Sequence, residues 1–364
     1  MTFRGVAVAD ATKIHGLIIR ESEPLNLEFP FSMLEQAITP RHQFFVRSHF
    51  SLPSLTAREW RLQVDGEVDS PFELTYDELR KLPAETRPAT IECAGNGRAF
   101  LVPKAKGVLW GTGAVGTAEW TGVLLSNVLR RAGVKPNAIE AIFQGADSGE
   151  VTEEPQSPGV IHFERSLPLT KANRPEVLLA YKMNGQDLNP EHGFPVRLVV
   201  PGWYGMASVK WLNRITLSST PFNGYWQSLE YSYFQRSQGR PSLVAITEMP
   251  VKASIARPAP HEAIPAGVVF RVFGAAWSGK SEIDSVEISI DGGSEWHSAD
   301  LLGRPLPYCW RLWEYQWQVP RDPGRYQLMV RATDKASAVQ PSGRDPDRRG
   351  YMINHTIPVD VEVV

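Results

Sequence analysis

The alternation of apolar and polar residues in the first two thirds of the chain predicts short strands mixed with helices. Residues 61–66 alternate and end at a glycine, which is typical of a strand that runs into a turn. Thr75, with a glutamate three positions later, forms a capping box and predicts the start of a helix. Apolar residues at helical spacing predict a second helix over residues 122–132, ended by the glycine that follows. The valine-rich run 195–200 predicts a buried strand.

The pattern changes near residue 248. From there on the chain consists of short alternating runs separated by turns rich in glycine and proline, and the runs cover residues 268–273, 285–291, 326–332 and 358–364. Several such strands at short spacing favour a β-sandwich of the immunoglobulin type. We therefore expect an α+β protein, with a mixed α/β domain in residues 1–247 and a sandwich domain in residues 248–364.

Composition narrows the functional classes. The net charge of −2 gives no basic field for nucleic acid, so an anionic substrate would need a local cluster of cations. No run approaches the ~20 apolar residues of a membrane span. The first 25 residues lack the apolar core of a signal peptide, so we expect a cytoplasmic protein, with a mature exported form as the alternative. Cys93 and Cys309 are too isolated for a disulfide framework or a zinc site.

Residues 92–98, Glu-Cys-Ala-Gly-Asn-Gly-Arg, place Cys93 between an apolar run and a glycine-rich turn. A thiol on such a turn is able to meet a bulky cofactor, and a thiolate is a soft ligand suited to a transition metal. Arg98 adds a fixed cation five positions later. A lone cysteine in an apolar context is more often a small buried side chain, so this segment needs support from the rest of the chain.

Residues 44–49, Phe-Phe-Val-Arg-Ser-His, precede the cysteine segment. In an extended strand their alternation would direct Arg47 and His49 to one side. The alternative is a surface strand with two polar residues.

A second polar cluster lies around the valine-rich strand, where His192, Arg197 and Lys210 fall within 19 residues. Two cations and a histidine near a buried strand need a counter-charge, which a bound phosphate would supply through bidentate and point-charge contacts. A set of structural ion pairs is the alternative. The Gly-x-Gly-x-x-Gly pattern that begins at Gly111 is a weak dinucleotide motif, because no strand–helix unit with a ribose-binding acid surrounds it.

In combination and order, these segments resemble the sulfite oxidase family of molybdopterin oxidoreductases, over about residues 40–364. The matching segments are the cysteine segment, Gly-Val-Leu-Trp at 107–110, Leu-Ala-Tyr-Lys-Met-Asn-Gly at 179–185, His-Gly-Phe-Pro-Val-Arg at 192–197 and Val-Lys-Trp at 209–211. The resemblance implies a molybdopterin-binding domain followed by a dimerisation domain, and hence a homodimer.

The resemblance also implies a role for each matched residue. Cys93 would be the single protein ligand of a molybdenum that molybdopterin holds. The residues matched to the substrate pocket are Arg47, Arg98, Trp110, Tyr231 and Arg349. Those matched to cofactor contacts are Phe45, His49, Asp147, His192, Arg197, Ser208, Lys210 and Trp211. Ser48 and Glu230 depart from the family pattern, which usually has Asn and Asp there.

The activity implied by the resemblance is molybdenum-dependent oxidation of sulfite to sulfate. The chain shows neither a haem-binding domain nor a Cys-x-x-Cys-His haem attachment motif, so we expect electrons to pass to an external acceptor such as a cytochrome or oxygen. Nitrate reduction or another small-oxyanion reaction is the alternative, and Arg349 favours sulfite. A non-catalytic binding module is disfavoured by Cys93 together with the cationic pocket.

Overall fold

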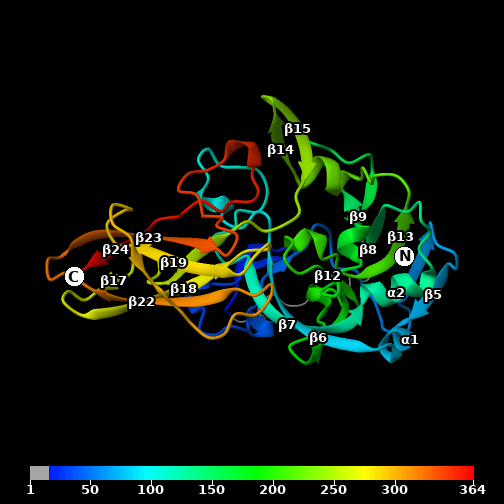
Figure 1. The fold of residues 1–364 in the computed structure, drawn as a ribbon, viewed down its shortest axis with the longest axis horizontal. Coiled ribbons are helices and arrows are strands. Elements are labelled where there is room, and N and C mark those ends of the chain that lie inside the picture. Colours follow the sequence, from blue (N-terminus) through cyan, green and yellow to red (C-terminus); the bar gives the residue numbers. More distant parts are fainter. Residues whose placement is uncertain (1–15) are drawn as a thin grey trace, which may run out of the picture.

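The computed structural model describes residues 16–364. Residues 1–15 lie outside the described part. They form most of the 25-residue segment on which the prediction about a signal peptide rests. The described chain forms two parts that lie side by side along the long axis of the molecule, with the C-terminal strands at one end (Figure 1). No helix in the described range is long and apolar enough to cross a membrane.

The first part is built mainly from three sheets, of which two have five strands each. The small N-terminal sheet contains β1 (Ile18–Glu21), β2 (Asn26–Glu28) and β3 (Val46–Arg47). The second sheet contains β6 (Ala84–Glu92), β7 (Val115–Leu124), β10 (Leu178–Met183), β11 (Gln186–Asp187) and β12 (Arg197–Val199). The third has the order β5 (Phe72–Thr75), β4 (Arg61–Gly66), β13 (Leu212–Ser218), β8 (Glu140–Glu150), β9 (Val160–Pro168). A hairpin of β14 (Ser232–Ser237) and β15 (Arg240–Ala245) projects from this part (Figure 1).

Helices are few and short. The α-helices are α1 (Tyr76–Lys81), α2 (Leu125–Ala132) and α3 (Leu169–Ala172). The 3-10 helices are η2 (Phe31–Met33), η3 (Arg41–Gln43), η4 (Arg98–Phe100), η5 (Pro190–His192), η6 (Gly205–Ala207) and η8 (Pro346–Arg348), and η7 (Trp226–Glu230) is a π-helix. The predicted capping box is confirmed, because Thr75 and Glu78 exchange both hydrogen bonds at the start of α1.

The predicted helix over 122–132 is wrong at its beginning. Residues up to Leu124 belong to β7, and α2 starts at Leu125. Gly122 pairs with Ala180 of β10, and a Cβ at this position would lie 2.1 Å from the carbonyl oxygen of Leu179. Close strand pairing therefore overrides the local helical spacing. The predicted end of the helix is confirmed by Gly133, which takes the left-handed conformation.

The second part is a sandwich of two sheets, and the strand runs predicted in it are confirmed. One sheet contains β16 (Lys252–Arg257), β18 (Val269–Trp277), β22 (Arg311–Gln318) and β21 (Asp300–Leu301). The other contains β17 (Ala263–Ile264), β24 (Val359–Val363), β23 (Gly324–Asp334), β19 (Ile283–Ser289) and β20 (His297–Ser298). Trp313 and Trp317 of the first sheet pack with Ile288 and Val330 of the second in a buried core.

The two parts share an apolar core rather than a loose contact. Trp277 and Trp310 of the sandwich belong to the same buried cluster as residues of the first part. Trp310 packs edge-on against Phe31 with ring centroids 6.4 Å apart and donates its indole N–H to the carbonyl of Ala37 at 2.7 Å. The sandwich is therefore able to influence the geometry of the first part directly.

Candidate active site

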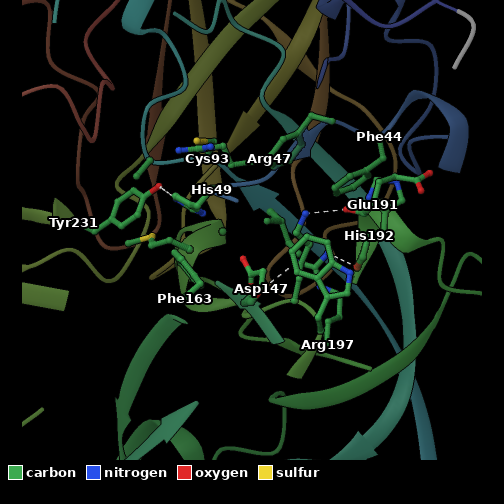
Figure 2. A pocket seen from close by; sticks show the side chains of 18 residues that line it. Phe44, Arg47, His49, Cys93, Asp147, Phe163, Glu191, His192, Arg197 and Tyr231 are labelled. Atoms are coloured by element: carbon green, nitrogen blue, oxygen red, sulfur yellow. Dashed lines mark hydrogen bonds between the residues drawn. The ribbon is translucent and has the colours of Figure 1, made fainter. Parts of the chain in front are cut away.

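A cavity in the first part is lined by apolar and aromatic side chains together with several converging polar groups, a composition typical of a small-molecule or cofactor site. Eleven of the fourteen predicted site residues line it. They are Phe45, Arg47, His49, Cys93, Asp147, His192, Arg197, Ser208, Lys210, Trp211 and Tyr231. In the view of Figure 2, Cys93, His49 and Tyr231 lie at the upper left, and His192 and Arg197 lie to the right and below.

Cys93 reaches the cavity because β6 ends one residue earlier and the chain turns sharply. Its N–H donates to the carbonyl of Ala114 at 2.9 Å, and its own carbonyl accepts from the N–H of Asn96 at 2.9 Å. Burial raises the pKa of the Cys93 thiol, and the nearby cations Arg47 and Arg98 act against that shift. A bound metal cation would favour the thiolate further.

The turn that carries Cys93 is fixed by a buried polar network. The Asn96 amide donates to the Glu92 carboxylate at 3.0 Å and accepts from the N–H of Ala114 at 3.0 Å. Glu92 also pairs with Lys252 of the sandwich at 2.8 Å, with both side chains only 1% exposed. The position of the thiol is therefore set partly by the second part of the chain.

Arg47 is oriented by the N-terminal sheet. Its guanidinium donates to the Asn26 side-chain oxygen at 3.2 Å, and the same oxygen accepts from the N–H of Ser48 at 3.0 Å. Asn26 is fully buried in β2, which pairs with β3. A cation held this way is preorganised to meet an anion in the cavity.

His49 and Tyr231 form a hydrogen-bonded pair, with 2.5 Å between the histidine Nε2 and the phenol oxygen. Burial lowers the pKa of His49 well below its ordinary value, and Arg47 and Lys210 lower it further. Burial also raises the pKa of Tyr231 to about 12. Both groups are therefore neutral near pH 7, and the imidazole tautomer decides which of the two donates. Phe163 stacks on the imidazole at 4.4 Å between centroids and holds its orientation.

The other end of the cavity is strongly cationic. Arg197 donates to the carbonyls of His192 and Ser208, both at 3.1 Å. Lys210 donates to the carbonyl of Glu191 at 2.8 Å and to the Ser48 hydroxyl at 3.2 Å. Neither cation forms a salt bridge with any residue in the described range 16–364. These groups are hydrogen-bonded, but their charge is not neutralised.

The pKa shifts at this end have burial as their main cause and repulsion between cations as a further one. Burial lowers the pKa of Lys210 to about 7, with Arg197 as a second cause. Burial lowers the pKa of Arg197 to about 9. For His192, burial and then Lys210 lower the pKa to about 3. An anion bound among these residues would favour their charged forms, oppose both effects and raise all three pKa values.

Asp147 and Arg197 provide a test of whether a cofactor fits. Asp147 is 4% exposed, and its Oδ1 has no hydrogen-bond partner among the described residues; the same holds for Nε of Arg197. Such buried orphans usually mark a missing ligand or water. Gly145 makes room here, because a Cβ would lie 2.4 Å from the Asp147 Oδ1. Burial raises the pKa of Asp147 to about 6.

The donor set fits a molybdenum pterin better than a metal bound by protein alone. Within residues 16–364, no group of three or more His, Cys, Asp or Glu side chains is arranged to hold a metal ion. A metal at Cys93 would therefore need most of its ligands from another molecule. The cavity offers that molecule unsatisfied donors at one end and a thiol at the other.

Arg98, Trp110 and Arg349 lie outside the cavity lining. The Arg98 guanidinium donates to the carbonyls of Gly350 and Val108, both at 3.0 Å, and packs between Gly95 and Gly107, where a Cβ would lie under 3 Å from it. Trp110 is fully buried in the core cluster that contains Cys93, and its indole N–H has no partner in the described range.

Arg349 has φ +56°, which is uncommon for a residue other than glycine. Its guanidinium donates to the Leu229 carbonyl at 2.9 Å and to the Ser232 hydroxyl at 2.9 Å, next to Tyr231. The roles of Arg98, Trp110 and Arg349 stay predictions.

The Gly-x-Gly pattern after Trp110 has a structural use. The buried Glu28 carboxylate accepts from the N–H groups of Gly111 and Gly113, both at 2.9 Å. A Cβ at Gly113 would lie 1.6 Å from the carbonyl oxygen of Phe29. The glycines therefore serve close packing against β2.

Sequence reasoning missed seven lining residues, which are Phe44, Ile91, Ala94, Phe163, Glu191, Gly205 and Met206. Phe44, Ala94 and Glu191 adjoin predicted residues, and Ile91 and Met206 lie two positions from one, so sequence proximity was a usable signal. Phe163 and Gly205 carry no local signal, because they enter the cavity only through the tertiary fold.

Comparison with known protein families gives two matches. The family described as "Oxidoreductase molybdopterin binding domain" matches residues 49–226, and "Mo-co oxidoreductase dimerisation domain" matches residues 243–363. The second match coincides with the sandwich.

Comparison with individual proteins extends over nearly the whole chain. The mitochondrial sulfite oxidase of Rattus norvegicus is 36% identical, over 98% of this chain and 67% of its own length. Sulfite oxidase of Gallus gallus is 36% identical, over 93% and 75%. A nitrate reductase of Hordeum vulgare is 32% identical over 99% of this chain and 44% of its own length. The crystal structure of the sulfane dehydrogenase SoxCD from Paracoccus pantotrophus has a TM-score of 0.81 at 28% identity and covers 98% of this chain and 92% of that one.

Proposed function

This chain belongs to the sulfite oxidase family of molybdopterin oxidoreductases, and from that premise we propose that it oxidises sulfite to sulfate and passes the electrons to an external acceptor. The observation that carries the proposal is one cavity that is lined both by the Cys93 thiol and by the cations Arg197 and Lys210, which form no salt bridge within residues 16–364. Arg197 lies away from Cys93 in the view of Figure 2. This arrangement suits an anionic cofactor with a metal at its thiol-facing end.

The cofactor is molybdenum with molybdopterin. Arg197, Lys210, His192 and Ser208 would hold its phosphate, and the Asp147 carboxylate would accept hydrogen bonds from its pterin ring. Phe45, His49 and Trp211 would line its flanks. The cofactor, when bound, supplies the two-electron redox chemistry.

The chain itself binds and orients the substrate. In the net reaction, sulfite gains one oxygen from water and loses two electrons, and two protons leave. Arg47, fixed by Asn26, provides charge-assisted hydrogen bonds to sulfite oxygens beside Cys93. Tyr231 stays protonated and keeps a neutral hydroxyl near the substrate. We expect Arg98 and Arg349, which lie behind the lining, to add positive charge to this end of the cavity.

Assembly and location are further parts of the proposal, and neither depends on the geometry of the cavity. We infer a homodimer formed through the second part, in which residues 243–363 match the dimerisation family. We also propose a domain boundary between residues 247 and 248, in the segment that joins β15 to β16. The cytoplasmic location and the identity of the acceptor, a cytochrome or oxygen, stay predictions from the sequence.

The test is metal analysis of the purified protein together with sulfite oxidation assayed against cytochrome, oxygen and an artificial acceptor. We expect one molybdenum per chain and sulfite-dependent reduction of at least one acceptor. Nitrate should be a poor substrate in the reverse assay with a reduced dye. Molybdenum with nitrate reduction and no sulfite oxidation would support the alternative activity, and an absence of molybdenum would refute the cofactor assignment.

A further inference from the structure

Tyr351 comes from the segment between η8 and β24, which returns to the first part of the molecule. In Figure 1 this red segment lies near the cyan loop that follows Cys93, and the N–H of Met352 donates to the carbonyl of Ala94 at 2.8 Å. The Tyr351 side chain is 8% exposed and does not line the cavity. It packs directly behind the lining residues.

Three predicted substrate-pocket residues contact this one side chain. The rings of Tyr351 and Tyr231 have centroids 5.2 Å apart. The Arg98 guanidinium lies 5.0 Å from the Tyr351 ring centroid, and that of Arg349 lies 6.0 Å from it. One aromatic ring therefore joins the wall residue Tyr231 to both arginines that stand behind the cavity.

The Tyr351 hydroxyl makes a further contact, because it donates a hydrogen bond to the Glu230 carboxylate. Glu230 ends the π-helix η7 and directly precedes Tyr231. The hydroxyl thus restrains the backbone that carries Tyr231, while the ring restrains its side chain. A hydrogen bond to a charged group is among the stronger restraints available to a neutral side chain.

Resting on the sulfite-oxidising function proposed above, we propose that Tyr351 is a positioning residue of the substrate pocket. Its ring sets the positions of Tyr231, Arg98 and Arg349, and its hydroxyl sets the position of Glu230. Without the ring, Tyr231 would lose a packing partner and both guanidinium groups would lose an aromatic face. Small displacements at such a site weaken anion binding, because charge-assisted contacts depend on geometry.

Two variants separate the two contacts. Tyr351→Phe keeps the ring and removes the hydrogen bond, and Tyr351→Leu removes both. We expect the KM for sulfite to rise about tenfold in Tyr351→Leu and about threefold in Tyr351→Phe, with a smaller change in kcat. The dissociation constant for sulfate, measured by calorimetry as an unreactive anion, should rise by the same factors. Molybdenum content should not change.

Tyr76→Leu is the matched control. Tyr76 is also buried, packs against Tyr181 and has the Arg80 guanidinium 5.4 Å from its ring centroid, yet it does not line the cavity. Its loss should lower stability and leave the KM for sulfite and the sulfate affinity unchanged. A purely structural role of Tyr351 would give that same result.

The outcomes are distinguishable. If wild type oxidises sulfite and Tyr351→Leu keeps the wild-type KM and sulfate affinity, the positioning role is refuted and the function stands. If Tyr351→Leu does not fold, Tyr351→Phe decides, and an unchanged KM and sulfate affinity would refute the role. If wild type with full molybdenum does not oxidise sulfite, the proposed function fails first.

Discussion

Glu92 and Lys252 form an ion pair at 2.8 Å with both side chains 1% exposed, whereas Arg197 and Lys210 lie in the cavity with no carboxylate partner in the described range. In the first cluster, Glu92 also accepts from the Trp277 indole at 2.8 Å, and Lys252 also donates to the carbonyl of Asn96 at 3.1 Å. Each charge there has an opposite charge and further hydrogen bonds. This cluster needs nothing from outside the chain.

The cavity cluster, which contains His192, Arg197, Lys210 and Asp147, is not paired in this way within the described residues. Arg197 lowers the pKa of Lys210, and both cations lower the pKa of His192. The Oδ1 of Asp147 and the Nε of Arg197 have no partner among the described residues. Burial of charge is costly unless it is paired, so a cluster left unpaired indicates a binding partner. The difference teaches that unpaired charges and polar atoms without hydrogen-bond partners identify a buried polar cluster as a binding site. The presence of charge alone does not.

The largest expected effect comes from the thiol between the two clusters. We expect Cys93→Ser to abolish sulfite oxidation while the fold remains intact, because a hard hydroxyl is a poor substitute for a thiolate at molybdenum. Acceptor reduction measures the activity, molybdenum content measures the metal bound, and circular dichroism measures whether the fold is intact. Cys309→Ser is the control and should cost packing only. Near-normal turnover by Cys93→Ser would remove Cys93 as the ligand.

A substitution in the Glu92–Lys252 cluster should change the stability of the fold. Lys252→Met leaves the Glu92 carboxylate buried and unpaired, so the free energy of unfolding should fall by about 3–5 kcal/mol. Chemical denaturation measures this. Lys280→Met removes the exposed pair with Glu248 and should cost less than about 1 kcal/mol. Equal losses in the two variants would show that the buried pair is no more important than a surface pair.

A substitution among the cavity cations should instead change the affinity for the cofactor. Lys210→Met removes a charge that burial and Arg197 disfavour, so the cofactor-free protein should be no less stable than wild type. Cofactor affinity should fall about tenfold to a hundredfold, because one charge-assisted contact contributes about 1.5–3 kcal/mol. Retained molybdenum after dialysis measures this. Lys135→Met, at an exposed ion pair, should retain all of it, and full retention in Lys210→Met would argue against a phosphate at this end.

The smallest effect is a pH dependence of the cofactor-free protein. The pKa of Lys210 is about 7 in the folded state against 10.5 ordinarily, so the unfolded state binds more protons between these values. The contribution of Lys210 to the free energy of unfolding should therefore increase as pH rises from 7 to 9. Denaturation at both pH values, in wild type and Lys210→Met, isolates this contribution. A wild-type slope that the variant reproduces would contradict it.

The sequence was informative wherever chemistry is local. The capping box at Thr75 and the glycine after α2 depend on neighbours within a few residues, and both were predicted. The cavity lining was largely predictable because the matched segments carry distinctive polar residues, as in the run that contains His192 and Arg197.

What the sequence did not reveal depends on distant contacts. Glu92 and Lys252 are 160 positions apart, and neither residue signals the pair on its own. Tyr351 meets Tyr231 only because the segment before β24 folds back onto the first part. Gly122 continues β7 since β10 approaches it closely, which no local pattern encodes.

The central claim is that an anionic cofactor completes the cavity cluster, and the pKa of the Lys210 ammonium tests it most directly. Selective 13C labelling of lysine, with the signal assigned by its absence in Lys210→Met, would give this pKa in cofactor-free and cofactor-loaded protein. We predict a pKa near 7 without the cofactor and a return towards the ordinary lysine value of 10.5 with it. The same pKa in both forms would contradict the claim that the cofactor's charge lies at this end of the cavity.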